Sequence, residues 1–305
     1  MIIGHQKQWQ FLKKSAETNR LSHAYLFFGQ ERLGKKTLAL EFIKFLNCQN
    51  NNQLSKPCQQ CFSCKDIQKR QHPDLFWIEP VGKEIQISQI RNLQWRLSLR
   101  PFSAPFKSAI IDQAHCMNSE AQSCILKTLE EPSGKAILIL ITEYPELLFS
   151  TILSRVQKIR FSPVPISEIE DYLKKQRIPQ EETNKIAFLS FGRPGLATDF
   201  LLNPQKLEYQ NQKVKEMVQI RQSDLIFRFQ YIKDAVSKKY NVKELLDIWL
   251  RYFREILFRT LKNDQTGYSL DRVKSIINTI QNINFLISTT NVNQRLALEQ
   301  LMLEI

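Results

Sequence analysis

The sequence predicts an α/β domain on a five-stranded parallel sheet, then a small helical segment, then an all-helical C-terminal domain. Short apolar runs alternate with helical patterns over the first 160 residues, and all 12 prolines lie at or before Pro204. The stretch 205–305 contains no proline and a single glycine, Gly267. Because proline and glycine interrupt helices and form turns, this stretch is expected to be a helical bundle. The expected domains are therefore residues 1–162, 163–204 and 205–305.

The elements of the first domain follow from their apolar patterns. Strands are expected at 24–28, 75–78, 109–111, 136–141 and 157–161, and helices at 37–46, 88–99 and 119–129. Ser119 and Gln122 are expected to form a capping box at the start of the last helix. Strands that alternate with helices imply a parallel sheet covered on both faces.

The rest of the chain is expected to be helical. Residues 163–204 fit about three short helices between proline and glycine breaks. In the C-terminal domain, apolar residues recur mostly in steps of three and four, which suits amphipathic helices with one buried face. They are Leu225, Phe227, Phe229, Ile232, Leu245, Leu246, Trp249, Leu250 and Phe253.

Composition excludes several classes of protein. Hydrophobic residues make up 43% and charged residues 24%, which is ordinary globular usage. The longest apolar run, 136–141, is far shorter than the ~20 residues of a membrane-spanning helix, and the polar N-terminus does not fit a signal peptide. A cytoplasmic protein is expected. The net charge of +13 suits a nucleic-acid partner or, equally, a lysine-rich solvated surface.

Four cysteines form a pattern typical of a metal site. Cys48, Cys58, Cys61 and Cys64 have the spacing C-x9-C-x2-C-x2-C, which offers four thiolates and leaves no coordination position open. This favours a structural zinc in a module at 48–64, against disulfides or free thiols. Cys116 and Cys124 are isolated, and His72 is expected to have a structural role.

A phosphate-binding loop of altered sequence follows the first strand. Gly29, Gly34 and Lys35 fit the pattern G-x-x-x-x-G-K-[ST], but Lys36 stands where a hydroxyl would hold Mg²⁺. Thr37 is one residue late, which turns its side chain by about 100° around the helix. The alternative is a glycine-punctuated turn that never meets a nucleotide.

The second half of a nucleotide site follows the third strand. Asp112 is the acid that helps hold Mg²⁺ in enzymes with this loop. The next position in many ATPases is a glutamate that activates water, and here it is Gln113, which cannot act as a base. The scaffold of an ATPase is present without two of its chemical groups.

In combination, these features resemble the clamp-loader branch of the AAA+ family, from bacterial DNA polymerase III. The matching segments are His23–Gly29, Gly34–Phe42, the four-cysteine insert, His72–Leu75, Leu126–Pro132 and Ile152–Arg155. They cover residues 20–200 in consistent order. Beyond that, the match is helical character alone.

The resemblance implies an AAA+ core, a helical lid and a helical collar that joins a hetero-pentameric ring. It implies that Arg155 acts as an arginine finger in the ATP site of a neighbouring motor subunit, and that Thr142 corresponds to a residue sensing the terminal phosphate. The lid arginine of motor subunits corresponds to Gly195, or to Arg193 in a shifted alignment. Implied partners are motor subunits, a delta subunit, the sliding clamp and, through the complex, primed DNA.

No autonomous ATPase activity is expected, and whether ATP still binds is left open. Two alternatives also stay open. One is an ATPase-active motor subunit of the same loader, and the other is a zinc-containing nucleic-acid-binding protein without a loader role.

Overall fold

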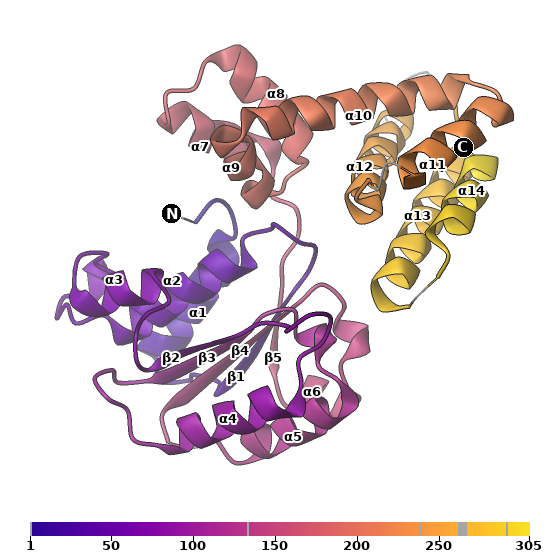
Figure 1. Ribbon diagram of the computed structural model, residues 1–305. Coiled ribbons are helices and arrows are strands. Elements are labelled where there is room, and N and C mark those ends of the chain that lie inside the picture. The colour runs from indigo at the N-terminus through magenta and orange to yellow at the C-terminus, as the bar shows by residue number, and fades with distance from the viewer. Residues whose placement is uncertain (1, 133, 238–239, 262–266, 291) are drawn as a thin grey trace. The chain divides into compact units, whose positions relative to one another are not determined.

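The computed structural model describes residues 2–132, 134–237, 240–261, 267–290 and 292–305. The chain forms two compact units, Met1–Thr198 and Asp199–Ile305, whose elements are labelled in Figure 1. Within the described residues, no helix has the length and apolar character needed to cross a membrane.

The first unit is built on a five-stranded parallel sheet, as expected. Its strands are β1 (Ala24–Phe28), β2 (Leu75–Ile78), β3 (Lys107–Ile111), β4 (Ala136–Thr142) and β5 (Gln157–Arg160). Their order across the sheet is β2-β3-β4-β1-β5, and all pairs are parallel. The carboxyl ends of β1, β3 and β4 therefore meet at one edge, where residues 29, 112 and 142 lie.

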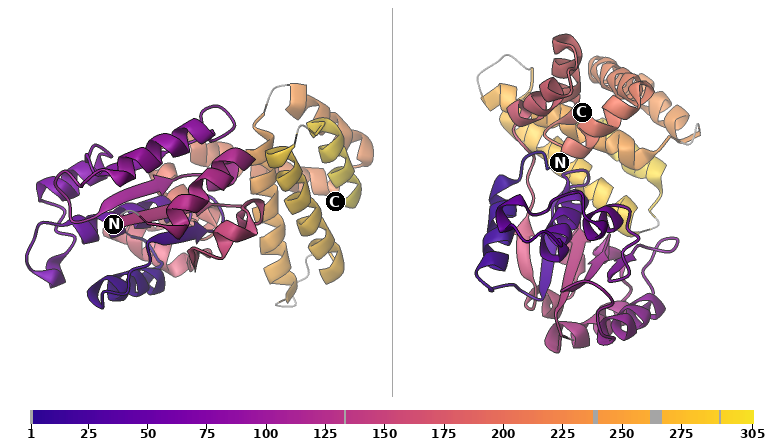
Figure 2. Two further views of the ribbon diagram at one scale, coloured as in Figure 1. Left: turned by 90° about the horizontal axis from the view of Figure 1, so that it is seen from below. Right: turned by 90° about the vertical axis from the view of Figure 1, so that its left-hand side faces the viewer.

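Helices cover both faces of this sheet, which Figures 1 and 2 show as two helical layers. One layer is α1 (Gln6–Glu17), α2 (Lys35–Asn47) and α3 (Phe62–Gln68), and the other is α4 (Ile87–Ser98), α5 (Ser119–Glu130) and α6 (Ser150–Leu153). Along β1, Tyr25 and Phe27 pack toward the first layer, while Ala24 and Leu26 pack toward the second. Burial on both faces explains why β1 and β4 are continuous apolar runs.

Short 3₁₀ turns complete the unit at η1 (Gln53–Ser55), η2 (Ala114–Cys116) and η3 (Pro145–Leu147). The expected capping box of α5 is wrong. Its N-cap is Asn118, whose side chain accepts from the Ala121 N–H at 2.9 Å. Gln122 instead donates to the carbonyl of Met117 and accepts from the N–H of Phe149. Asn118 is as good an N-cap as serine, and it comes one residue earlier.

The segment after β5 forms α7 (Ile166–Lys175), α8 (Gln180–Ser190) and α9 (Pro194–Leu202). These are the three short helices expected. The Gly195 N–H, in the first turn of α9, donates to the Arg32 carbonyl at 2.8 Å. The start of α9 therefore lies against the loop that precedes α2.

The described part of the second unit is helical: α10 (Pro204–Gln222), α11 (Leu225–Ser237), α12 (Val242–Leu261), α13 (Leu270–Thr289) and α14 (Gln294–Glu304). Trp249 and Phe253 of α12 are fully buried in its core, as expected. For Leu225 and Phe227 the expected burial is wrong, because their side chains are 47% and 49% exposed. Ile232 is buried, so the inward face of α11 begins further along the helix.

Candidate functional site

The four cysteines come together as the spacing predicts. Cys48 caps the end of α2, Cys58 and Cys61 lie in the following loop, and Cys64 is in the first turn of α3. All four Sγ atoms lie within 4.8 Å of one another. Tetrahedral zinc with Zn–S bonds of about 2.3 Å places its sulfurs about 3.8 Å apart. The cluster is therefore compact enough to hold one metal ion.

Backbone donors prepare these sulfurs as ligands. The N–H groups of Cys58, Cys61 and Cys64 each point at the preceding ligand's sulfur at 3.4 Å. The N–H groups of Cys61 and Gln60 lower the pKa of Cys58 to about 6, because they stabilise its thiolate. Burial raises the pKa of the Cys64 thiol, and a bound cation would favour its thiolate. The donor set fits a metal that takes thiolates.

The cysteine module is joined to α2 by a buried polar network. The Lys44 ammonium lies 2.8 Å from Glu41 Oε1 and 2.9 Å from Gln59 Oε1, and it also donates to Gln68. Gln59 in turn donates to Glu41 Oε2 at 2.7 Å. Gln59 follows Cys58, so the module's fold and the buried charge pair of α2 depend on each other.

Among the described residues, the candidate metal cluster consists of the four cysteines and does not include His72. The His72 ring accepts a hydrogen bond from the Asp74 N–H at 3.1 Å. The Asp74 carboxylate accepts from the backbone N–H groups of Phe102, Ser103 and Ala104 at 2.8 to 3.0 Å. These bonds lower the pKa of Asp74, although burial acts in the opposite direction. The segment His72–Leu75 therefore positions the loop between α4 and β3.

The phosphate-binding loop makes contacts with itself. Lys35 is buried, and its ammonium donates to the carbonyls of Gly29 and Gln30, to the latter at 2.6 Å. Burial lowers the pKa of Lys35 to about 8, although Glu143, Glu31 and Asp112 oppose this shift. The cation that would meet a phosphate is thus engaged by the loop's own carbonyl groups.

Lys36 pairs with the acid at the end of β3. Its ammonium forms an ion pair with Asp112 Oδ2, and the Asp112 side chain is 2% exposed. Thr37 is exposed and lines a small cavity with Gly34, Pro194 and Gly195. Thr37, one of the residues expected to bind nucleotide, therefore faces the start of α9. Its neighbour Lys36 instead pairs with Asp112.

Thr142 and Gln113 complete this edge of the sheet. The buried Thr142 hydroxyl lies 3.0 Å from His115 Nδ1 and accepts from the Tyr144 N–H, so local partners already hold it. Gln113 is exposed and has a left-handed backbone conformation with φ of 50°. The structure brings Gly29, Lys35, Asp112 and Thr142 together.

The segment around Gly195 closes over the loop. A Cβ atom on Gly195 would lie 2.8 Å from the Arg32 carbonyl oxygen, so a larger residue cannot fit without movement. Arg193 is buried and close enough to Lys35 to help lower its pKa. The cavity between loop and lid has a volume of about 70 Å³. Ligand sites are commonly ~300 Å³ or larger.

Arg155 lies away from this site, just after α6. Its guanidinium forms an ion pair with Glu130 of α5 at 2.9 Å and donates to the Thr151 carbonyl at 2.9 Å. The two charged side chains are 36% and 51% exposed. The next residue, Val156, is buried in the core.

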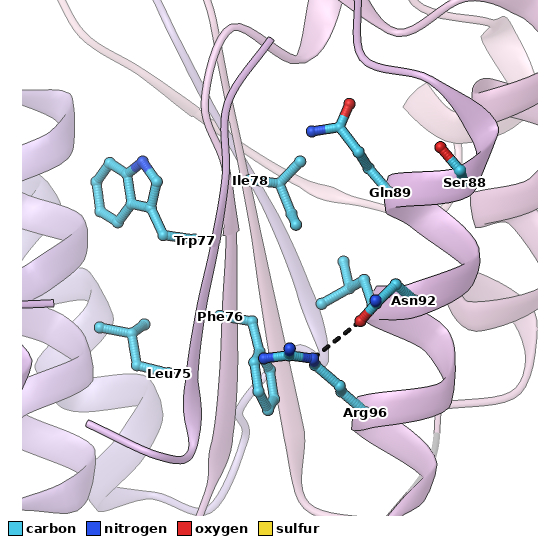
Figure 3. Close-up of a pocket in the computed structure, with 9 residues that line it drawn as sticks. Leu75, Phe76, Trp77, Ile78, Ser88, Gln89, Asn92 and Arg96 are labelled. Carbon is cyan, nitrogen blue, oxygen red and sulfur yellow. Dashed lines mark hydrogen bonds between the residues drawn. The ribbon is translucent and has the colours of Figure 1, made fainter. Parts of the chain in front are cut away.

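A separate groove of about 460 Å³ runs along the edge strand β2 and α4. Figure 3 shows Phe76 and Ile78 facing Asn92 and Arg96 across it, with Trp77 on the opposite side of the strand. The strands β3 and β4 separate it from β1 and the phosphate-binding loop.

The strand order, the loop after β1 and the acid after β3 define a core of the AAA+ class. A structure of a DNA polymerase III gamma subunit-related protein from Thermotoga maritima shares this fold, with a TM-score of 0.51, 20% identity and 97% coverage of both chains.

Sequence comparison identifies the family. Residues 4–165 match the family model described as DNA polymerase III, delta subunit. The chain is 32% identical over 270 residues to the delta' subunit of Bacillus subtilis, covering 88% of this chain and 81% of that protein. It is 28% identical to delta' of Pseudomonas aeruginosa, covering 84% and 78%. The B. subtilis tau subunit is 30% identical over 57% of this chain and 31% of tau. The chain belongs to the delta' family of DNA polymerase III, which confirms the clamp-loader resemblance.

Two contacts were not predictable from motifs: Gly195 with Arg32, and Arg155 with Glu130. The two motifs place Lys36 and Asp112 at the same Mg²⁺ position, and the structure adds that the two side chains form an ion pair. The two glycines of the segment 192–195 are the available sequence signal for a close backbone approach.

Proposed function

We propose that this chain is a non-motor clamp-loader subunit that assembles with gamma/tau motor subunits and a delta subunit in a hetero-pentameric ring. In this role it helps to place the beta sliding clamp on primed DNA in the cytoplasm. It contributes structure and one arginine, and does not turn over ATP. The observation that carries the proposal is the similarity of this chain to delta' over most of its length. In its nucleotide site, Asp112, the acid that would help to hold Mg²⁺, forms an ion pair with the chain's own Lys36.

We assign three parts to this role: a core at 1–162, a lid at 163–204 and a collar at 205–305. The second unit supports a role in assembly because large apolar side chains are exposed on α11 and α14. Ile226 is 79% exposed, and Leu296 and Leu303 are 62% and 61% exposed. These two helices pack together, with Arg228 donating to the Met302 carbonyl at 3.2 Å. Exposed apolar surface of this kind favours a protein partner.

Arg155 is proposed to enter the ATP site of a neighbouring motor subunit. Its pair with Glu130 is largely exposed, so the cost of releasing the guanidinium is small. A planar, forked donor then stabilises the charge on a transferring phosphoryl group.

The cysteine module is proposed to hold one structural zinc through Cys48, Cys58, Cys61 and Cys64. When bound, the metal supplies folding free energy to a short segment that has little apolar core of its own. The thiolates, their backbone donors and the Lys44 network then fix the module on α2.

Reconstitution from purified subunits tests the proposal. We expect the chain to co-elute with motor and delta subunits and to be required for clamp loading. Replacing Leu296 and Leu303 with serine should weaken assembly, whereas serine in place of Phe102, which is 83% exposed in the first unit, is the matched control. A chain that elutes alone at micromolar concentrations would contradict the proposal. ATP hydrolysis by the chain alone would favour a motor subunit.

A further inference from the structure

We infer that Lys36 is a built-in counter-ion for Asp112 that replaces Mg²⁺, so that the phosphate-binding loop is assembled without nucleotide. The proposed function requires only that ATP is not turned over, and this inference is independent of ring assembly. It concerns what Lys36 does at the position from which it excludes Mg²⁺.

Asp112 needs a positive partner where it lies. Its backbone N–H donates to the Ile78 carbonyl at 2.9 Å, which holds the residue at the end of β3. Its side chain is 2% exposed, and within the described part of the chain Oδ2 has no hydrogen-bond donor of good geometry. A buried carboxylate without a countercharge is strongly unfavourable. In a phosphate-binding loop protein Mg²⁺ provides that charge, and here the Lys36 ammonium does.

Two further tethers hold the same loop. The Lys35 ammonium donates hydrogen bonds to the carbonyl groups of Gly29 and Gln30, so bonds between its own residues close the loop. On the outer side, the Arg32 carbonyl accepts the Gly195 N–H from α9. The loop is thus joined to β3, to itself and to the lid.

The space left beside the loop agrees with this picture. The cavity of about 70 Å³ is lined by Gly34, Thr37 and Gly195 among others, and is too small for a nucleotide base. The Lys36 side chain is 47% exposed, whereas the Asp112 side chain is 2% exposed. Removing the lysine therefore uncovers a buried charge and opens a position for a cation.

Thermal unfolding of the full chain in chelator-free buffer tests the ion pair. Lys36→Met removes the ammonium and keeps a side chain of similar length, and we expect the melting temperature to fall by about 5 °C or more. Adding Asp112→Asn to Lys36→Met should recover most of that loss, because no buried charge is left unpaired. Lys7→Met, at an exposed position on α1, is the matched control and should change little. A Lys36→Met protein as stable as the control, or a double variant with no recovery, would overturn the inference.

A second measurement tests the replacement of Mg²⁺. The wild-type melting temperature should not respond to MgCl₂ alone, because the Lys36 ammonium already pairs with Asp112. Lys36→Thr restores the hydroxyl, and this variant should gain a Mg²⁺-dependent rise in melting temperature. A Mg²⁺-dependent rise in the wild type, or none in Lys36→Thr, would refute the role of Lys36 as the excluding residue. Because both measurements use the isolated chain, their failure is distinct from failure to assemble a clamp loader.

Discussion

Replacing Arg155 with alanine should separate the chain's own stability from its proposed contribution to catalysis in a neighbouring subunit. In the structure Arg155 forms an ion pair with Glu130 at 2.9 Å and donates hydrogen bonds to the Thr151 carbonyl and the Ser154 hydroxyl. Both charged side chains are more than one third exposed, so solvent screens their attraction. Exposed pairs of this kind contribute roughly 0.2–1 kcal/mol. We therefore expect Arg155→Ala to lower the free energy of unfolding by no more than about 1 kcal/mol.

The expected catalytic effect is much larger than the effect on stability. An arginine finger contributes ~10³ or more to the rate at one site, which corresponds to about 4 kcal/mol of transition-state stabilisation. The site that receives Arg155 should lose nearly all of its turnover. In the proposed ring the other ATP sites would take their arginine fingers from other subunits, so the total rate should fall by that one site's share.

DNA-stimulated ATP hydrolysis by the reconstituted ring is the assay, with assembly checked by size-exclusion chromatography. Glu130→Gln is the matched control, because it removes the partner of Arg155 in this chain and leaves the guanidinium in place. We expect this control to keep ATP hydrolysis, and Arg155→Lys to lose it, since an ammonium cannot reproduce the forked donor geometry. Equal rates for wild type and Arg155→Ala at equal assembly would refute the finger and leave Arg155 as a surface residue.

Three more outcomes are expected. Metal analysis should find one zinc per chain, with less than half an equivalent counting against the site, and Cys61→Ser should unfold the module while the sheet survives because it has its own apolar core. The isolated chain should hydrolyse ATP at least roughly a hundredfold more slowly than a motor subunit, because Lys36 and Gln113 replace the metal ligand and the base; comparable turnover would contradict this. Gly195→Ala should destabilise the chain by roughly 1–3 kcal/mol in chemical denaturation, because its Cβ would meet the Arg32 carbonyl at 2.8 Å; unchanged stability would show that the lid shifts freely.

The sequence by itself determined the parallel sheet, the cysteine cluster and the altered phosphate-binding loop. These features are local: a continuous apolar run is typical of a strand that is buried on both faces, and four thiols within one short segment are close enough along the chain to share one metal ion. The position of Lys36, where a hydroxyl would hold Mg²⁺, likewise follows from the fixed spacing of the phosphate-binding motif. The burial of Leu225 and Phe227 was predicted wrongly, because periodicity marks an apolar face without saying whether a neighbouring helix covers it.

Only the tertiary structure decided which charges meet. The pairing of Lys36 with Asp112 depends on β3 lying two strands from β1 in the order β2-β3-β4-β1-β5. Glu130 reaches Arg155 because α5 and α6 pack on the same face of the sheet. The approach of Gly195 to Arg32 depends on how the segment after β5 returns to the loop after β1. Each contact joins residues far apart in the chain, and local propensity holds no information on such distances.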